Sequence, residues 1–247
     1  MHNSTRMLIA LFLGGALPAV APAGPVEDGV AAYHRGDSAT GLRLFRAAAA
    51  KGDADAQYDL GIIYEHGNGV AKNYAEAMRW YRRSAAQGHA RAQVLLGLMY
   101  EQGEGVPKNA VEALKWYRLS AMQGNAGAED FVGSHYYEGK GVEKDLTEAL
   151  RWWRLSAAQG DSGGQFDLGI AYEFGEGVAV DNAEAMRWYR LAAGQGHAIA
   201  QFSVGRMYEE GRGVAEDEAE ALTWYKLAAA QGNADAAKAV ARLTSRN

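Results

Sequence analysis

Histidines and carboxylates are the side chains that most often bind metals or transfer protons, and the chain contains six histidines and thirty acidic residues. The histidines stand apart in the sequence, without a His-x-x-x-His pair. His89 and His197 occupy corresponding positions just before predicted helices, where a side chain that caps the helix is expected. The spacing therefore predicts helix caps and no metal site.

Glycine-rich segments before helices can bind phosphate, and Gly69-Val70-Ala71-Lys72 has this general form. The segment follows a predicted helix rather than a strand, and it lacks the Gly-Lys-Ser/Thr ending of a phosphate-binding loop. No Ser-x-x-Lys acylation motif occurs in the chain. We therefore predict no catalytic residue, no cofactor and no enzymatic activity.

All of these residues belong to a unit that recurs every 36 residues. The glycine that closes the unit recurs at Gly52, Gly88, Gly124, Gly160, Gly196 and Gly232. A tryptophan recurs in the same register at Trp80, Trp116, Trp152, Trp188 and Trp224. A fixed period of this length is typical of a solenoid, in which each unit packs only against its neighbours.

Each unit has the pattern of two helices. In the first unit, apolar residues spaced by four predict a helix A that ends near Gly67, because glycine enters the left-handed region at no steric cost. Asn73, followed three residues later by Glu76, predicts the start of helix B, and an Asn or Asp followed three residues later by Glu recurs in each of the five units. Gly61 lies within helix A, where glycine costs about 1 kcal/mol relative to alanine. We therefore expect helix B to approach closely there, with Trp80 and Tyr64 filling the space on either side.

The unit from Ala54 to Gly88 reads nearly completely as A-x-A-Q-x-x-L-G-x-x-Y-E-x-G-x-G-V-x-x-N-x-x-E-A-x-x-W-Y-x-x-A-A-x-Q-G. This motif resembles the Sel1-like repeat, a relative of the tetratricopeptide repeat, and the resemblance covers about residues 26–244. It implies an all-α fold: a right-handed α/α solenoid of about five 36-residue helix-loop-helix repeats with capping helices at both ends. We place the repeats at 53–88, 89–124, 125–160, 161–196 and 197–232, between a capping hairpin (24–52) and a C-terminal capping helix (233–247). The resemblance also implies a binding protein or scaffold.

The first residues have the form of a secretory leader. Arg6 supplies one positive charge, residues 7–17 are an apolar run too short to span a bilayer, and Ala21-Pro22-Ala23 fits a signal peptidase site. We predict a signal peptide over residues 1–23, cleavage between Ala23 and Gly24, and a periplasmic or secreted protein without stable membrane insertion. The absence of cysteine means that no disulfide stabilises the fold.

The net charge and the capped ends of the solenoid argue against nucleic acids and further copies of the chain as partners. Without the leader, 24 basic residues (25 minus Arg6) face 30 acidic residues, so the mature net charge is −6. This balance argues against a nucleic-acid-binding surface, which needs clustered lysine and arginine. Capped ends favour a monomer, because they leave no open surface for further stacking.

The variable positions of helix A predict a binding face. Positions 55, 58, 62 and 66 of the first unit lie on one face of a helix, and the residues at positions 58, 62 and 66 differ from unit to unit. The equivalent face of tetratricopeptide proteins lines a concave groove. We predict an apolar groove, interrupted by Asp130 and Ser134, that takes an extended or helical peptide. Its residues are Tyr58, Ile62, Val94, Leu98, Phe166, Ile170, Phe174 and Phe202.

Two alternatives stay open. Groove and core positions are adjacent on a helix, so several of these residues could instead belong to the core. The second alternative concerns the class of ligand, which could be a polypeptide or a glycan. The leading hypothesis is a non-enzymatic scaffold that binds a protein or peptide, since aromatic side chains anchor such interfaces. The alternative is a binder of cell-envelope glycan or peptidoglycan fragments, which could stack on the same aromatic rings.

Overall fold

The computed structural model describes residues 24–245, which form thirteen helices and no strand. The predicted signal peptide lies outside the described residues. The helices are α1 (Pro25–His34), α2 (Ser38–Ala50), α3 (Ala54–His66), α4 (Tyr74–Ala86), α5 (Ala90–Gln102), α6 (Ala110–Ala121), α7 (Ala126–Glu138), α8 (Leu146–Ala158), α9 (Ser162–Phe174), α10 (Asn182–Gly194), α11 (Ala198–Glu209), α12 (Glu218–Ala230) and α13 (Ala234–Thr244). The prediction of an all-α chain is confirmed.

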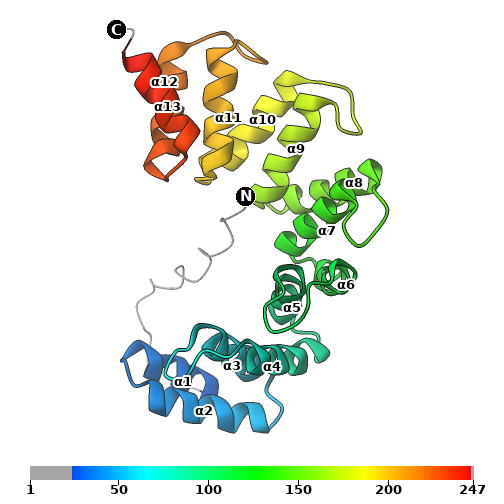
Figure 1. The fold of residues 1–247 in the computed structure, drawn as a ribbon, viewed down its shortest axis with the longest axis vertical. Helices are drawn as coiled ribbons and strands as arrows, with labels where there is room; N and C mark the ends of the chain where they lie inside the picture. The colour runs from blue at the N-terminus through cyan, green and yellow to red at the C-terminus, as the bar shows by residue number, and fades with distance from the viewer. Residues whose placement is uncertain (1–23, 246–247) are drawn as a thin grey trace.

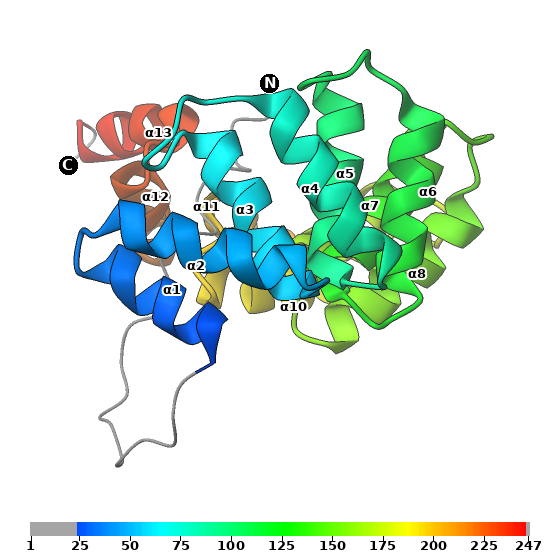
Figure 2. The ribbon, with the colours of Figure 1, turned by 90° about the horizontal axis from the view of Figure 1, so that it is seen from below.

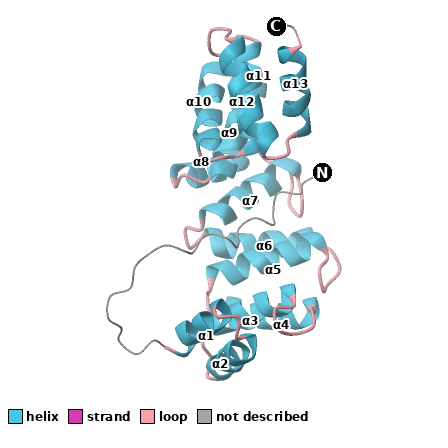
Figure 3. Ribbon diagram, turned by 90° about the vertical axis from the view of Figure 1, so that its left-hand side faces the viewer, coloured by secondary structure: helices cyan, strands magenta, loops and turns pink. Residues whose placement is uncertain are grey.

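The helices stack in pairs along an arc, which confirms the predicted solenoid (Figure 1). At the middle of the arc, α5 and α7 lie on its inner side and α6 and α8 on its outer side. Figure 2 views the arc from the end that α1 and α2 form. From α3 onward, long loops join the two helices of a pair and short turns join one pair to the next, whereas α1 and α2 are joined by the short turn of residues 35–37 (Figure 3). None of the helices in residues 24–245 is long and apolar enough to cross a membrane.

The helix ends follow the predicted capping signals. The Asp53 side chain accepts a hydrogen bond from the Ala56 backbone N–H (2.8 Å) at the start of α3, and Asn73 accepts one from Glu76 N–H (3.1 Å) at the start of α4. Gly67 ends α3 in the left-handed conformation, at φ 77°. Each bond satisfies a backbone donor that the helix itself leaves without a partner, so the local sequence fixes where the helices begin.

The glycine within helix A allows close packing, but a different ring fills the space. A Cβ atom on Gly61 would overlap the ring of Tyr81, which is fully buried. The prediction that Trp80 and Tyr64 take this place is wrong, because Tyr81 is the residue of α4 that faces α3 at this level. The arrangement recurs in each later pair. The glycine and ring pairs are Gly97 with Tyr117, Gly133 with Trp153, Gly169 with Tyr189 and Gly205 with Tyr225.

Trp80 and Tyr64 instead connect consecutive helix pairs. Trp80 of α4 is half-buried against the apolar cluster that α2 and α3 share. Arg46 of α2 donates a hydrogen bond to the Tyr64 hydroxyl (2.8 Å), and Arg82 bonds Tyr100 in the same way (2.8 Å). These two columns therefore hold each pair against the next, while the glycine and ring column holds each pair together.

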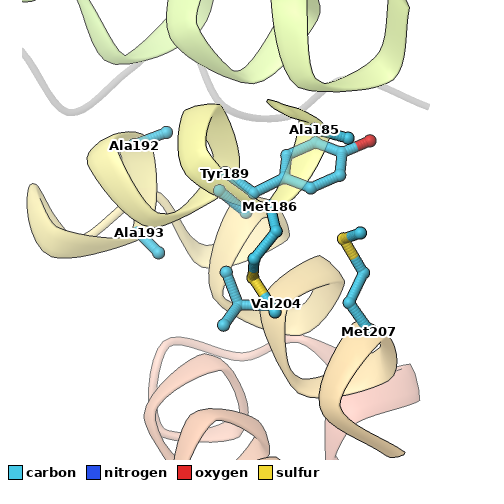
Figure 4. Close-up of a cluster of buried hydrophobic side chains, with 8 residues drawn as sticks. Ala185, Met186, Tyr189, Ala192, Ala193, Val204 and Met207 are labelled. Carbon is cyan, nitrogen blue, oxygen red and sulfur yellow. The ribbon is translucent and has the colours of Figure 1, made fainter. Parts of the chain in front are cut away.

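The core runs as a series of small apolar clusters between successive helices. Figure 4 shows one of them, in which Tyr189 and Met186 of α10 lie near Val204 and Met207 of α11. All four side chains are almost completely buried. At the C-terminal end, α13 packs against α12 and buries Leu243, so the last pair does not expose its apolar side.

Candidate protein-binding face

The predicted groove residues lie on the odd-numbered helices, at positions equivalent to 58, 62 and 66. We call this surface the inner stripe. Seven of the eight predicted residues are half-buried, and Phe174 is 59% exposed. They are Tyr58 and Ile62 of α3, Val94 and Leu98 of α5, Phe166, Ile170 and Phe174 of α9, and Phe202 of α11.

The half-buried aromatic residues belong partly to the core. Tyr58 lies against Tyr81, with 6.1 Å between the ring centroids, and Phe166 lies against Tyr189 at 5.6 Å. Phe202 repeats this contact with Tyr225 at 5.5 Å. Each ring therefore covers the buried tyrosine below it while part of its surface stays open. The same side chain thus contributes to the core through its buried part and to the predicted groove through its exposed part.

The two histidines at the predicted capping positions do cap helices. His89 Nδ1 accepts a hydrogen bond from Ala92 N–H, and His197 Nδ1 accepts one from Ala200 N–H, both at 3.1 Å. Burial lowers the pKa of His197, which favours the neutral ring that can accept this bond. Both rings also stack on an inner-stripe aromatic residue. The centroid distances are 4.6 Å to Tyr58 and 4.8 Å to Phe166.

Two open clefts, each about 300 Å³, lie at the two ends of the inner stripe. The N-terminal cleft is lined by Val30, Tyr33, His34, Phe45, Asp59, Ile62, Ile63 and Asn68. The C-terminal cleft is lined by Phe202, Arg206, Glu209, Glu210, Tyr225, Asp235, Lys238, Ala239 and Arg242. Ile62 of the inner stripe lines the N-terminal cleft. The C-terminal cleft is lined by Phe202, Arg206 and Glu210, which are the equivalents of positions 58, 62 and 66. The stripe is therefore a surface that another molecule can contact.

The C-terminal cleft neutralises its own charges. Arg242 pairs with Glu209 at 2.6 Å, and Lys238 pairs with Asp235 at 2.9 Å. Arg206 reaches the buried Glu173 at 2.6 Å. A ligand of either charge would have to compete with these internal pairs.

Polar residues interrupt the stripe at its middle, as predicted for Asp130 and Ser134. The Ser134 hydroxyl lies 3.3 Å from a carboxylate oxygen of Asp167, a residue that the sequence did not single out. Burial raises the pKa of Asp167 to about 6, and burial together with the charge of Asp167 raises the pKa of Asp130 well above its ordinary value. Asp130 is thus the carboxyl that holds the proton when the pair shares one.

Asp59 is the second carboxylate that sequence reasoning missed. It holds on α3 the position that Asp167 holds on α9. Burial, together with the nearby charges of Asp55 and Asp53, raises the pKa of Asp59 to about 7. A charged residue at a position that is Leu95 or Phe131 in other pairs was the available signal.

The described residues contain no group of three or more histidine, aspartate or glutamate side chains placed to hold a metal ion. The polar groups of the inner stripe are spread along the arc and do not converge on one point. The arrangement offers contact area and local charge, which are properties of a binding surface.

Comparison with known proteins identifies the repeat. The Sel1 repeat family model matches residues 28–53, 54–89, 90–125, 126–161, 162–197 and 198–233. The first match is shorter than the others and covers the hairpin expected as an N-terminal cap, so the family model counts six repeats. No curated protein sequence matches the chain significantly.

Solved structures agree with this match. A Sel1 repeat protein from Oxalobacter formigenes is 38% identical, with a TM-score of 0.82 over 88% of this chain and 87% of that one. The protein c5321, a protective antigen of uropathogenic Escherichia coli, is 35% identical with a TM-score of 0.78, over 90% of this chain and about half (49%) of that one. An immunity protein from Pseudomonas aeruginosa shares the fold at 20% identity, with a TM-score of 0.55 over 86% of this chain and 83% of that one. The chain belongs to the Sel1 repeat family.

Proposed function

We propose that the protein is a non-enzymatic periplasmic or secreted scaffold that binds a partner protein or peptide along the inner stripe. The Sel1 repeat is generally a protein-interaction fold. The observation that carries the proposal is the contrast between two kinds of position. Residues that hold the pairs together repeat along the chain, whereas residues of the inner stripe change from pair to pair on an accessible surface.

The inner stripe suits a polypeptide better than a glycan. A sugar needs one open aromatic face, but Tyr58 and Phe166 each already stack one face on a histidine. The apolar residues are instead distributed over several helix pairs, as an elongated ligand would require. Phe174, which is 59% exposed at the end of α9, is the most accessible aromatic residue of the stripe and a suitable anchor.

Site-specific cross-linking tests this proposal. A photoreactive phenylalanine analogue replaces Phe174 in the mature protein, which begins at Gly24, and the protein is irradiated with envelope extract and culture fluid of the source cells. The matched control carries the analogue at Leu155, an apolar residue of α8 that is 42% exposed. We expect a protein adduct at position 174 that is absent at position 155.

The captured protein is then tested for direct binding. Phe174→Glu should weaken binding at least tenfold and leave the melting temperature unchanged, while Leu155→Glu should affect neither. Equal capture from both positions would contradict an inner binding face. Retention of wall fragments, without any protein adduct, would favour the glycan alternative.

A second experiment addresses the location of the protein. The protein is purified from its natural source and its N-terminus is sequenced. We expect the first residue to be Gly24. A protein that retains residues 1–23 would contradict cleavage at the predicted site.

A further inference from the structure

The N-terminal cleft has apolar walls on three sides. Val30 of α1 is 39% exposed at its rim, while Phe45 of α2 and Ile63 of α3 form its buried part. The Tyr33 hydroxyl donates a hydrogen bond to the Asn68 carbonyl (3.2 Å), which ties α1 to the loop after α3. The shape of the cleft therefore depends on contacts between the first two helix pairs.

A carboxylate without a partner lies among these walls. Asp59 is half-buried and has no hydrogen bond or ion pair with any described residue. Its acidic neighbours are occupied elsewhere. Asp55 pairs with His89 at 3.1 Å, and Asp53 caps α3. Burying part of a carboxylate without a counter-charge is unfavourable, and this cost raises its pKa to about 7.

Asp167 and the acidic residues of the C-terminal cleft differ from Asp59 in this respect. Asp167 has the Ser134 hydroxyl beside it, and the acids of the C-terminal cleft lie against arginine or lysine. Asp59 is therefore a carboxylate beside the inner stripe that has neither a hydrogen bond nor an ion pair within the described residues, and it lines a cleft large enough for a side chain.

We propose that this cleft binds a lysine or arginine side chain of the partner polypeptide, with its aliphatic stem against Val30, Phe45 and Ile62 and its charged end on Asp59. Such side chains bury an apolar stem and present a cation, which matches both properties of the cleft. A purely apolar side chain would bury Asp59 without a counter-charge. This inference rests on the proposed function and specifies its ligand: a segment in which apolar residues flank a basic one.

Selection from a random peptide library displayed on phage tests the chemistry of the ligand. The mature protein is the target. The peptide with the highest affinity is then synthesised in two forms, with its basic residue intact and with that residue replaced by norleucine or citrulline. Binding is measured by calorimetry at pH 8, where Asp59 is ionised. Methyl resonances of Val30, Ile62 and Ile63 report where the peptide lies.

We expect the selected peptides to share a basic residue between apolar ones. Asp59→Asn, or neutralisation of the basic residue, should weaken binding at least about tenfold, which corresponds to the loss of one charge-assisted contact. The matched control, Asp55→Asn, removes an equal charge one turn away and outside the cleft, and should weaken binding less than about threefold. Asp59→Asn should melt no lower than the wild type, so a loss of binding would not reflect unfolding.

Three results would overturn the inference: selected peptides without a basic residue, equal binding to Asp59→Asn, or no selected peptide at all. The first two would leave peptide binding elsewhere on the inner stripe intact. The third is distinguished from failure of the proposed function by the cross-linking at position 174, which uses natural partners and does not involve this cleft.

Discussion

Among the five helix pairs from α3 with α4 to α11 with α12, the third pair, α7 with α8, differs from the other four. In those pairs the buried tyrosine hydroxyl donates a hydrogen bond to a glutamate, as Tyr81 does to Glu65 (2.6 Å) and Tyr189 to Glu173 (2.7 Å). In the third pair Trp153 replaces the tyrosine and Tyr137 replaces the glutamate, and the two rings lie 5.4 Å apart. A donor and its acceptor have been lost together, and an aromatic contact has taken their place.

The geometry explains why both positions changed. The indole N–H of Trp153 lies against Gly133 and has no hydrogen-bond partner among residues 24–245. It therefore does not replace the hydroxyl that serves the glutamate elsewhere. A glutamate at position 137 would lack its donor, which costs about 1–3 kcal/mol when the group is buried. The comparison shows that the repeated residues act as coupled sets.

The third pair also carries the polar interruption of the inner stripe. Glu129 stands where the other pairs have glutamine, and Asp130 and Ser134 stand where most others have apolar residues. The helices α7 and α9 contact each other directly, more than other neighbouring inner helices do. The stripe is thus divided at α7 into an N-terminal and a C-terminal apolar part.

The largest expected effect on stability comes from placing a tryptophan, as at Trp153, at the equivalent position of another pair. Tyr81→Trp should destabilise the protein by about 3–5 kcal/mol, because it overfills the site at Gly61 and leaves Glu65 without its donor. Adding Glu65→Tyr should recover about 1 kcal/mol or more. Denaturant unfolding of both single variants and the double variant measures the coupling. Strictly additive effects would contradict a coupled set.

The next effect compares Asp59 and Asp167, which hold the same position in different pairs. The pKa of Asp59 is raised from 3.8 to about 7, so stability is lost as pH rises from about 4 through 7. Asp59→Asn should therefore stabilise the protein by about 2 kcal/mol at pH 8, with an upper limit of about 4 kcal/mol, and by little at pH 4.

Thermal melts across this range measure the difference between variant and wild type. The other titratable groups around Asp59 are His34 and Tyr33 of α1 and Asp53 and Asp55 of α3, and both proteins contain them. Asp167→Asn should stabilise less at pH 8, because the pKa of Asp167 is about 6 and Ser134 already supports the charged form. An equal gain for both variants would contradict the assignment of Asp59 as the less complemented carboxylate.

A smaller effect is expected from returning Glu129 to the common residue. In three other pairs the glutamine donates a hydrogen bond to a carbonyl of the preceding helix, as Gln93 does to Ala85 (3.2 Å). Glu129 cannot donate when ionised, and burial raises its pKa. Glu129→Gln should add about 1 kcal/mol to the free energy of unfolding at pH 7. A loss of stability in denaturant unfolding would show that the carboxylate has a favourable role here.

The smallest effect concerns a serine on the outer helices. The Ser84 hydroxyl donates a hydrogen bond to the Ala54 carbonyl (2.7 Å), whereas the buried Ser156 hydroxyl of the third pair has no partner in the part of the chain that the structure describes. Ser84→Ala should cost about 1 kcal/mol, and Ser156→Ala should be neutral or slightly stabilising. Matched thermal melts of the two variants measure the difference, and equal costs would contradict it.

Much of the fold could be predicted from the sequence because its signals are local. Asp53, Asn73 and Gly67 mark helix ends through contacts within a few residues, and the structure confirms each of them. The period of 36 residues follows from recurrence within the chain, and a solenoid follows from it because each unit meets only its neighbours. The caps at His89 and His197 were predictable for the same reason.

The tertiary structure alone decided the contacts between helices. Trp80 and Tyr81 are adjacent in sequence and equally suited to cover Gly61, and only the rotation of α4 against α3 selects Tyr81. The half-burial of Tyr58 and the open cleft at Asp59 likewise depend on how α1, α3 and α5 lie relative to one another. The position of a residue along a helix determines the direction in which its side chain points. How deeply that side chain is buried depends on the distance to the neighbouring helix, and no local sequence signal encodes this distance.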